Sequence, residues 1–188
     1  MLWKERLQSK LIPSSSPDPN DETDGVSCVL VAIGPHAQTG RDEILLMKRT
    51  MQVETHKGQV SFPGGFREPH DENLLSTALR ETKEEIGVEP HSVDVLGRLS
   101  PVRTRGNILI YPWVAVTQFP HPFVLSLEEV DRLLFLPVER LLSEGLKKYS
   151  VQTEGVQLQS LGIEVEGELV WGATARMLQE LRELLLES

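Results

Sequence analysis

The sequence predicts a single α/β domain in which helices cover a mixed β-sheet. Its 188 residues suit one domain rather than two and are enough to bury a core. Hydrophobic and charged residues make up 39% and 25% of the chain, as in ordinary globular enzymes. Strand-like and helix-like segments follow one another without strict alternation. This order favours a mixed sheet over a doubly wound parallel one.

The first residues predict a helical arm and a connector. Residues 2–12 show the spacing of a short amphipathic helix. Its apolar residues fall on or near one face: Leu2, Trp3, Leu7 and Leu11. Residues 13–25, PSSSPDPNDETDG, are dominated by turn formers and predict a mobile connector. We therefore divide the chain into an arm with its connector, residues 1–24, and a main domain, residues 25–188.

The main domain reads as strands and helices separated by loops. Strands are expected at 25–33, 43–48, 58–62, 93–102 and 108–117, and a hairpin at 149–158 and 161–169. Helices are expected at 72–87, at 137–144 with Pro137 at its start, and at 171–186. Residues 35–42 and 105–107 are expected to be connections, and Pro63-Gly64-Gly65 a turn.

Composition excludes several classes of protein. The net charge of −9 argues against a general nucleic-acid binder, which needs a basic surface. No segment reaches the roughly 18 apolar residues of a membrane span, and residues 1–13 lack the apolar run of a signal peptide. We expect a cytoplasmic protein with no membrane partner. Cys28 is the single cysteine, so no intramolecular disulfide can form, and its apolar surroundings predict a buried strand position.

The helix at 72–87 gathers three acids on one side. At about 100° per residue, its core face holds Leu75, Ala78, Leu79, Thr82 and Ile86. Glu81, Glu84 and Glu85, at i, i+3 and i+4, fall in an adjacent sector. Their mutual repulsion would be relieved by a divalent cation. Three carboxylates suit Mg²⁺ or Mn²⁺ better than zinc. A solvated acidic patch is the alternative for this spacing taken alone.

The neighbours of these acids have structural roles of their own. Arg80 lies one turn before Glu84 and can hold a carboxylate by paired hydrogen bonds. Asp71 or Glu72 can cap the helix at its N-terminal end. Gly87 can provide the left-handed stop at the other end.

From Gly65 to Val88 the sequence resembles the Nudix box. That signature is a Gly, five residues, a Glu, seven residues, then Arg-Glu-apolar-x-Glu-Glu-x-Gly-apolar. Gly65 begins it here and RETKEEIGV, residues 80–88, ends it. The intervening segment is one residue longer, so either Asp71 or Glu72 takes the first acidic position. Thr82 stands where an aliphatic residue is usual, and its methyl group can still face the core.

The preceding segment, LLMKRTMQVETHKGQVSFPGG, resembles the extra motif of the coenzyme A pyrophosphatase branch. The positions in register are Leu45, Leu46, Arg49, Gly58, Phe62, Pro63, Gly64 and Gly65. EEVDRLLFLPVERLL and WGATARML also look like this branch. The resemblance implies a Nudix α/β/α sandwich with a mixed β-sheet. It also implies divalent-metal-dependent hydrolysis of coenzyme A or its derivatives to 3′-phosphoadenosine 5′-phosphate and 4′-phosphopantetheine.

Two further readings stay open beside that one. Glu54 replaces the second arginine of the branch motif, so ADP-ribose or a nucleoside diphosphate sugar is an alternative substrate. A non-catalytic binding module of the same fold is a remote alternative, because such modules tend to lose the box acids. An isomerase on a similar scaffold would need a cysteine as one of its catalytic pair, and the single cysteine lies in the first strand.

The resemblance also assigns roles to individual residues. It implies metal ligation by Glu81, Glu84, Glu85 and the Gly64 carbonyl, and orientation of these acids by Arg80. Glu84 is the first candidate for the general base, Glu129 the second, with Glu128 beside it. Substrate contacts are expected from Arg49, Lys57, Gly65, Arg67 and Arg103, with His56 and Arg105 as further candidates. Trp113 and Trp171 are expected in the core rather than against a base. The family also makes a homodimer plausible.

Overall fold

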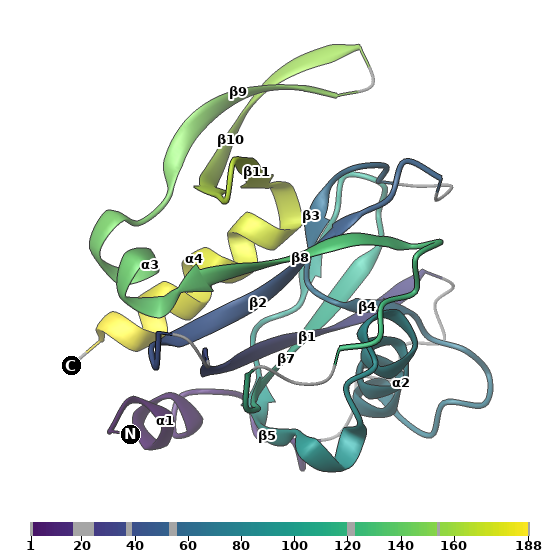
Figure 1. Cartoon of the computed structure of the whole chain (residues 1–188), viewed down its shortest axis with the longest axis vertical. Coiled ribbons are helices and arrows are strands. Elements are labelled where there is room, and N and C mark those ends of the chain that lie inside the picture. The colour runs from purple at the N-terminus through teal and green to yellow at the C-terminus, as the bar shows by residue number, and fades with distance from the viewer. Residues whose placement is uncertain are drawn as a thin grey trace.

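The computed structural model of the protein describes residues 2–16, 25–36, 39–52, 56–119, 123–153 and 155–187. It shows the predicted mixed α/β architecture, with a large sheet between helices (Figure 1). The strands of this sheet are β1 (Val26–Pro35), β2 (Asp42–Arg49), β3 (Val60–Ser61), β4 (Gly64–Phe66), β5 (Asp94–Arg98), β6 (Val102–Arg103), β7 (Leu109–Val116) and β8 (Val130–Pro137). A second sheet holds β9 (Lys147–Thr153), β10 (Val156–Val165) and β11 (Glu168–Trp171). The helices are α1 (Leu2–Gln8), α2 (Leu74–Ile86), α3 (Val138–Glu144) and α4 (Gly172–Leu186), with a short 3₁₀ helix at Pro90–Ser92.

Strand β1 is the centre of the large sheet. It pairs in parallel with β7 along most of its length and antiparallel with β2 near its end. Strands β1 and β2 then diverge, so that β4 pairs with the start of β1 and β3 with the end of β2. On its other edge β2 pairs along its whole length with β8. The sheet is mixed, as the sequence predicted.

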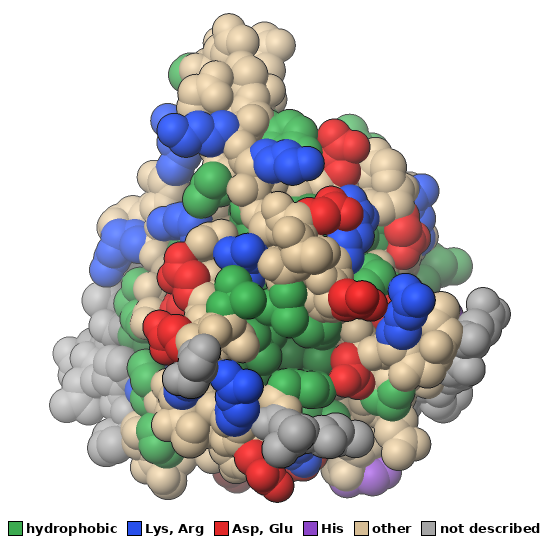
Figure 2. All heavy atoms as spheres, turned by 90° about the vertical axis from the view of Figure 1, so that its left-hand side faces the viewer, with side chains coloured by type: hydrophobic (Ala, Val, Ile, Leu, Met, Phe, Trp, Pro, Cys, Tyr) green, Lys and Arg blue, Asp and Glu red, His purple; other side chains and the backbone are tan. Residues whose placement is uncertain are grey.

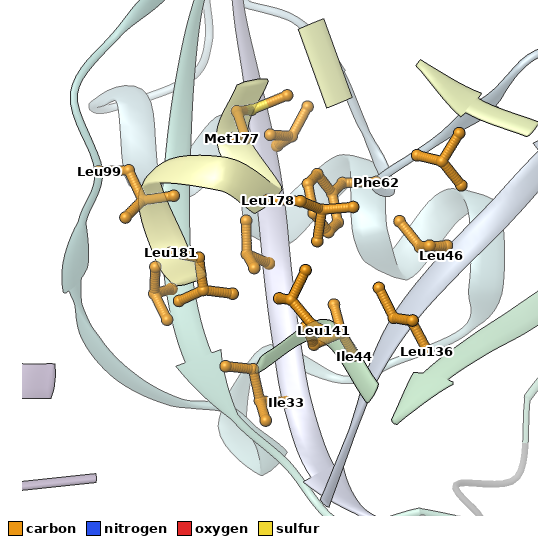
Figure 3. Close-up of a cluster of buried hydrophobic side chains, with 14 of the residues drawn as sticks. Ile33, Ile44, Leu46, Phe62, Leu99, Leu136, Leu141, Met177, Leu178 and Leu181 are labelled. Carbon is orange, nitrogen blue, oxygen red and sulfur yellow. The ribbon is translucent and has the colours of Figure 1, made fainter. Parts of the chain in front are cut away.

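The two faces of the sheet bury separate hydrophobic clusters. One lies under α4, α3 and α1 and includes Val31, Ile33 and Leu178 (Figure 3). The other lies under α2 and includes Cys28, Leu30 and Trp113. Successive side chains of a strand point to opposite faces, so a strand covered on both sides reads as one continuous apolar run. This explains the uninterrupted VSCVLVAI segment and confirms the predicted burial of Cys28.

The N-terminal arm packs into the first of these clusters. Helix α1 is shorter than predicted, yet Leu7 and Leu11 are buried against the domain. The Trp3 indole Nε1 donates to Asp42 Oδ2 at 2.8 Å, and Ile12 pairs with Arg98 at the edge of β5. Residues 17–24 of the predicted connector lie outside the described residues.

The structure departs from the predicted elements in four places. Gly64 and Gly65 belong to a strand rather than a turn, because β4 pairs with β1. The segment predicted as one strand at 93–102 is divided into β5 and β6 by Leu99-Ser100-Pro101, where the proline cannot donate to a sheet. Strand β8 was not predicted at all. The predicted hairpin turn near 159–160 is wrong, since Gln159 and Ser160 pair with β9.

The second sheet carries a long hairpin away from the body. The turns fall near Gly155 and Gly167, which have positive φ angles of 76° and 83°. Figure 2 shows the β9–β10 hairpin projecting from the molecule, and charged side chains of both signs mixed on the face below it. No helix in the described part of the chain is long and apolar enough to cross a membrane.

Candidate active site

Helix α2 is held in place by signals at both of its ends. Asn73, not Asp71 or Glu72, is the N-cap: its side chain accepts from the Ser76 amide, and the Ser76 hydroxyl accepts from the Asn73 amide. This reciprocal pair satisfies two of the backbone N–H groups that a helix start leaves unpaired. Gly87 ends the helix with φ 73°, confirming the predicted left-handed stop.

The buried face of α2 is rotated from the predicted one. Leu75 and Leu79 are only partly buried and pack at the edge of the core. The buried side chains are Leu74, Thr77, Ala78, Thr82, Glu85 and Ile86. Thr82 replaces the usual aliphatic residue at little cost, because its hydroxyl donates to the Ala78 carbonyl at 2.6 Å. We call Glu81, Glu84 and Glu85 the acid row. Glu85 is the one acid of this row that faces the core.

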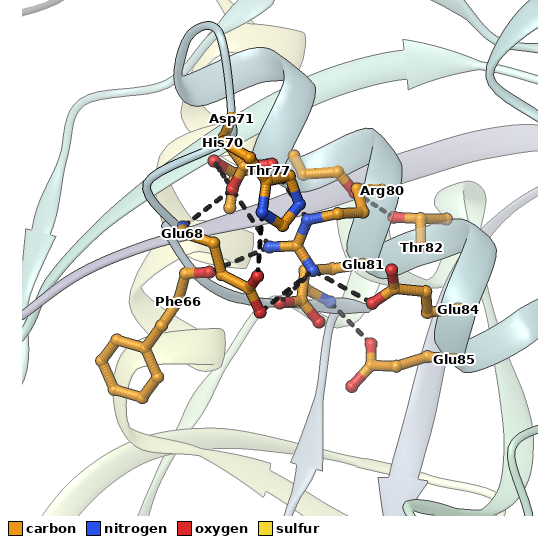
Figure 4. Close-up of polar contacts among 12 residues, drawn as sticks. Phe66, Glu68, His70, Asp71, Thr77, Arg80, Glu81, Thr82, Glu84 and Glu85 are labelled. Atoms are coloured by element: carbon orange, nitrogen blue, oxygen red, sulfur yellow. Dashed lines mark hydrogen bonds and ion pairs between the residues drawn. The ribbon is translucent and has the colours of Figure 1, made fainter.

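Arg80 is the hub of the site (Figure 4). Its Nε and Nη2 donate to the two carboxylate oxygens of Asp71, at 2.9 and 3.1 Å. Its Nη1 donates to Glu81 and to Glu84, at 3.0 Å each. Its Nη2 also donates to the Phe66 carbonyl at 3.1 Å. One guanidinium therefore ties the helix acids to the end of β4.

Asp71 holds the guanidinium of Arg80 in position. Its carboxylate is buried and also accepts from the Thr77 hydroxyl and the Glu68 amide. The hydrogen bonds from Arg80 hold the pKa of Asp71 well below its usual range, and the same contact raises the pKa of Arg80. Asp71 rather than the exposed Glu72 occupies the first acidic position of the box.

Glu85 is a buried acid with two fixed partners. Its side chain is 1% exposed. Its two oxygens accept from the Arg49 guanidinium at 3.1 Å and from the Gly64 amide at 2.8 Å. Burial raises the pKa of Glu85 to about 8, against the opposing effect of these two donors.

Glu81 lies close beside the glycine strand. A Cβ on Gly65 would stand 2.4 Å from the Glu81 carboxyl carbon, so only glycine lets β4 approach this side chain. At Gly64, with φ 148°, a Cβ would stand 2.1 Å from the Cys28 carbonyl. Burial raises the pKa of Glu81, and the charge of Arg80 opposes this effect. The two glycines are therefore required by packing against β1 and α2.

Two further acids at the site, Glu84 of the row and the neighbouring Glu129, are exposed. Glu84 and Glu129 have side chains that are 57% and 47% exposed. Arg49 lies between Glu85 and Glu129, with Nη2 3.8 Å from Glu129 Oε2. Glu128 and Glu129 stand in a turn before β8.

The loop that carries Glu129 is pinned to the end of α2. The amides of Val124 and Ser126 donate to the carbonyls of Ile86 and Glu85, which the helix itself leaves free. On its other side, Thr50 donates its amide to the Glu129 carbonyl and its hydroxyl to that of Glu128. The position of Glu129 is thus set by the C-terminal end of α2.

The donor set has the chemistry of a site for a hard divalent cation. Glu81, Glu84 and Glu85 offer only oxygen atoms, and Gly64 adjoins them through its amide contact with Glu85. Two of the three acids are largely buried, and burial disfavours their charged forms, so a cation between them would compensate both. Among the described residues no three acid, histidine or cysteine side chains converge around one point, and Arg80 donates hydrogen bonds to both Glu81 and Glu84.

The predicted cationic residues are placed unevenly. Arg49 reaches the acids, whereas the exposed side chains of Lys57, Arg67 and Arg105 form no hydrogen bond or ion pair with another described residue. The Arg103 guanidinium donates to the carbonyl and side chain of Asn107 in the next turn. His56 Nδ1 lies 3.1 Å from Gln59 Oε1 at the surface. Trp113 is buried as expected, Trp171 is half-buried at the start of α4, and Glu54 lies outside the described residues.

A groove opens beside Arg49. Its volume is about 410 Å³, and it runs between the end of β2 and the start of β8. The lining residues are Lys48, Arg49, Thr50, Met51, Gln52, Leu127, Val130 and Asp131. Met51 and Leu127 expose 69% and 77% of their surface at this groove. An apolar rim therefore lies directly next to the Glu85 end of the acid row.

Comparison with known proteins now decides the family. The sequence profile of the NUDIX domain matches residues 25–151. The chain belongs to the Nudix family. Uncharacterized Nudix hydrolases named NudL from Yersinia pestis and Yersinia pseudotuberculosis are 34% identical to it over 143 residues, which cover 74% of this chain and 71% of theirs. The protein is accordingly a Nudix hydrolase of the pyrophosphatase type.

Solved structures agree with the Nudix fold. An Ap4A hydrolase of C. elegans in a binary complex gives a TM-score of 0.52 at 20% identity, covering 63% of this chain and 85% of that one. A MutT/nudix family protein from Enterococcus faecalis gives 0.55 at 15% identity, covering 90% of this chain and 65% of that one. At these identities the likeness establishes the fold of this Nudix protein. The substrate must be inferred from the residues of the site.

Proposed function

We propose that this Nudix protein hydrolyses the diphosphate bond of a nucleoside diphosphate linked to another moiety, with Mg²⁺ or Mn²⁺ as cofactor. The observation that carries the proposal is the row Glu81, Glu84 and Glu85 at the end of a glycine strand, organised by Arg80. The C. elegans relative, by its name, acts on a dinucleoside polyphosphate, which fits this class of substrate.

In this proposal the three acids bind the cation, and their neighbours position them. Glu81, Glu84, Glu85 and the Gly64 carbonyl would hold the cation, which would neutralise charge on the diphosphate and lower the pKa of the attacking water. Arg80 keeps Glu81 and Glu84 oriented through its contacts with Asp71. Gly65 leaves room for the Glu81 carboxylate beside β4, which would place the backbone of Gly65 next to the substrate.

Glu84 and Glu129 are the candidates for the general base. Both are exposed to solvent, so either can take a proton from a water molecule near the row. Glu84 accepts a hydrogen bond from Arg80, which holds its carboxylate beside Glu81. Glu129 is held near Glu85 through Arg49 and by the loop contacts with α2. We retain Glu84 as the first candidate and Glu129 as the second.

The substrate that fits best is coenzyme A or one of its derivatives. The motif from Leu45 to Gly65 matches the coenzyme A branch, and the groove next to Arg49 has an apolar rim suited to an aliphatic moiety. ADP-ribose or a nucleoside diphosphate sugar is the second candidate, because Glu54 departs from the motif. Arg49, Lys57, Arg67 and Arg103 are the proposed phosphate contacts. We also propose that the protein is cytoplasmic and acts on this small molecule as a homodimer.

A substrate panel tests the proposal directly. The purified protein would be assayed with Mg²⁺ and with Mn²⁺ on coenzyme A, acyl-coenzyme A, ADP-ribose, UDP-glucose, GDP-mannose and dinucleoside polyphosphates, with products identified by mass. Release of 3′-phosphoadenosine 5′-phosphate as the best reaction supports the coenzyme A assignment. A preference for ADP-ribose or a nucleotide sugar supports the second candidate. If none of the compounds is hydrolysed although the metal binds, the enzymatic proposal is contradicted and a binding module is favoured.

A further inference from the structure

Phe66 differs from the other four phenylalanines of the chain in its surroundings. Phe62 and Phe119 are buried, and Phe123 and Phe135 pack against the core under α2. Phe66 is 51% exposed, although it stands in a strand rather than at the tip of a loop. Exposing an aromatic ring forgoes the stabilisation that its burial would give. An exposed ring is common at a protein surface, so the location of Phe66 beside the acids is what makes it a candidate for ligand contact.

The backbone of Phe66 is fixed by the same groups that build the acid row. It pairs with Ser27 in β1, and its carbonyl accepts from Arg80. Gly65, immediately before it, stands against the Glu81 carboxylate. Figure 4 shows the ring at this side of the row, directed away from the carboxylates.

Two different surfaces therefore flank the acids. At the Glu85 end lies the groove with the aliphatic rim of Met51 and Leu127. At the Glu81 end lies the aromatic ring of Phe66, followed by the exposed Arg67. The two glutamates are one helical turn apart, about 6 Å along the axis, so they can span a diphosphate and leave one substituent at each end.

A nucleoside diphosphate suits this arrangement. Its base is separated from the α-phosphate by the ribose, so the base must bind beside the acids rather than among them. The flat face of a phenylalanine ring stacks on any nucleobase, and such stacking is sequence-tolerant. We propose that Phe66 is the platform on which the nucleobase of the substrate stacks. This inference rests on the proposed function for the identity of the ligand.

Binding of AMP and of ribose 5-phosphate, which lacks the base, separates stacking from phosphate binding. Titration calorimetry in excess Mg²⁺ would compare the wild type with Phe66→Ala and Phe66→Trp. The wild type is expected to bind AMP more tightly than ribose 5-phosphate by on the order of tenfold or more, the range of base stacking on an aromatic side chain. Phe66→Ala should remove most of this difference and leave ribose 5-phosphate binding unchanged, whereas Phe66→Trp should retain it.

Val156→Ala is the matched control, because Val156 is similarly exposed but lies on the distant hairpin. It should change neither affinity. Equal binding of the two ligands by the wild type, or equal weakening of both by Phe66→Ala, would overturn the proposal. So would an oligomer that Phe66→Ala converts to monomer while the ratio of the two affinities stays the same.

The substrate panel keeps this inference distinct from the proposed function. If the wild type hydrolyses panel compounds but the AMP preference does not depend on Phe66, the platform is wrong and the function stands. If Phe66-dependent AMP binding is found and no compound is hydrolysed, the hydrolytic function is wrong and the nucleotide site stands.

Discussion

Single residues outside the acid row determine whether the row is ordered. Asp71 binds two nitrogens of Arg80, which in turn holds Glu81 and Glu84. The sequence left two residues possible for the first acidic position of the box, and only the packing of Asp71 under Thr77 decides between them. A helical wheel likewise identified the acids but not Glu85 as the buried one, since its burial depends on how α2 packs against Gly64 in β4 and Arg49 in β2.

Replacement of Asp71 tests the support of Arg80. Asp71→Asn should lower the free energy of unfolding by roughly 1.5–3 kcal/mol at neutral pH, the range for hydrogen bonds to charged groups. It should also lower kcat, because Arg80 loses its anchor. Urea denaturation and steady-state kinetics measure the two effects. Glu72→Gln, at the exposed neighbour, is the control and should stay within about 0.5 kcal/mol of the wild type.

The difference in stability between wild type and Asp71→Asn should also depend on pH. The pKa of Asp71 is lower in the folded than in the unfolded protein, so its contribution is fully present above the unfolded value of 3.8. That contribution is lost as the pH falls from 3.8 towards the folded pKa. The difference in stability between wild type and Asp71→Asn should therefore be constant from pH 7 to about 5 and narrow below 3.8. A difference that widens on acidification would contradict the assignment.

Among the elements, the end of α2 couples the helix to the loop that carries Glu129. Gly87 has φ 73°, and a Cβ there would stand 2.8 Å from the Val124 amide nitrogen. Gly87→Ala should cost about 1–2 kcal/mol for the left-handed conformation and more for the clash. It should also lower activity by displacing Glu129. Gly155→Ala is the control. Gly155 has φ 76° and no atom lies within 4 Å of an added Cβ, so this variant measures the cost of the left-handed conformation without a clash.

The two glycine variants would be compared by denaturation and by turnover. Gly155→Ala should lose stability alone, whereas Gly87→Ala should lose more stability and also turnover. Equal losses of stability with unchanged turnover in both variants would show that the loop does not depend on the helix end.

The elements were predicted well where the chain itself carries a strong signal. Strands β1, β2 and β7 are long apolar runs, and α2 and α4 have a clear helical period. Strand β8 was missed because VDRLLFLP has an apolar pattern that suits a helix or a strand, and its pairing with β2 decides the outcome. The β9–β11 register also depended on partners, since the polar Gln159 and Ser160 resemble a turn but lie in a strand.

On the scale of the whole molecule, the N-terminal arm is part of the main fold. Leu7 is completely buried between α1 and the domain. Leu7→Ala should lower the free energy of unfolding by about 2–5 kcal/mol, because it leaves a cavity in the core. Turnover well below the melting temperature should be unchanged, since the arm does not reach the acid row. Leu186→Ala, at a residue that is 47% exposed, should be nearly neutral.

Differential scanning fluorimetry and turnover at low temperature would check this pair. An arm that is only loosely attached would give equal melting temperatures for Leu7→Ala and Leu186→Ala. The sequence predicted the amphipathic helix of this arm but could not show its contact with the core, because residues 13–25 separate the two and carry no packing signal.

The measurement that tests the central claim most directly is the Mg²⁺ dependence of turnover in wild type and Glu85→Gln, on the best substrate of the panel. Glu85→Gln keeps the size of the side chain and removes the charge that would hold the cation. The wild type should be active with Mg²⁺ and inactive in EDTA, and the variant should be at least on the order of 100-fold slower at every Mg²⁺ concentration while remaining folded. Hydrolysis that persists in EDTA, or wild-type turnover by a folded Glu85→Gln protein, would contradict a metal-dependent hydrolase built on this row.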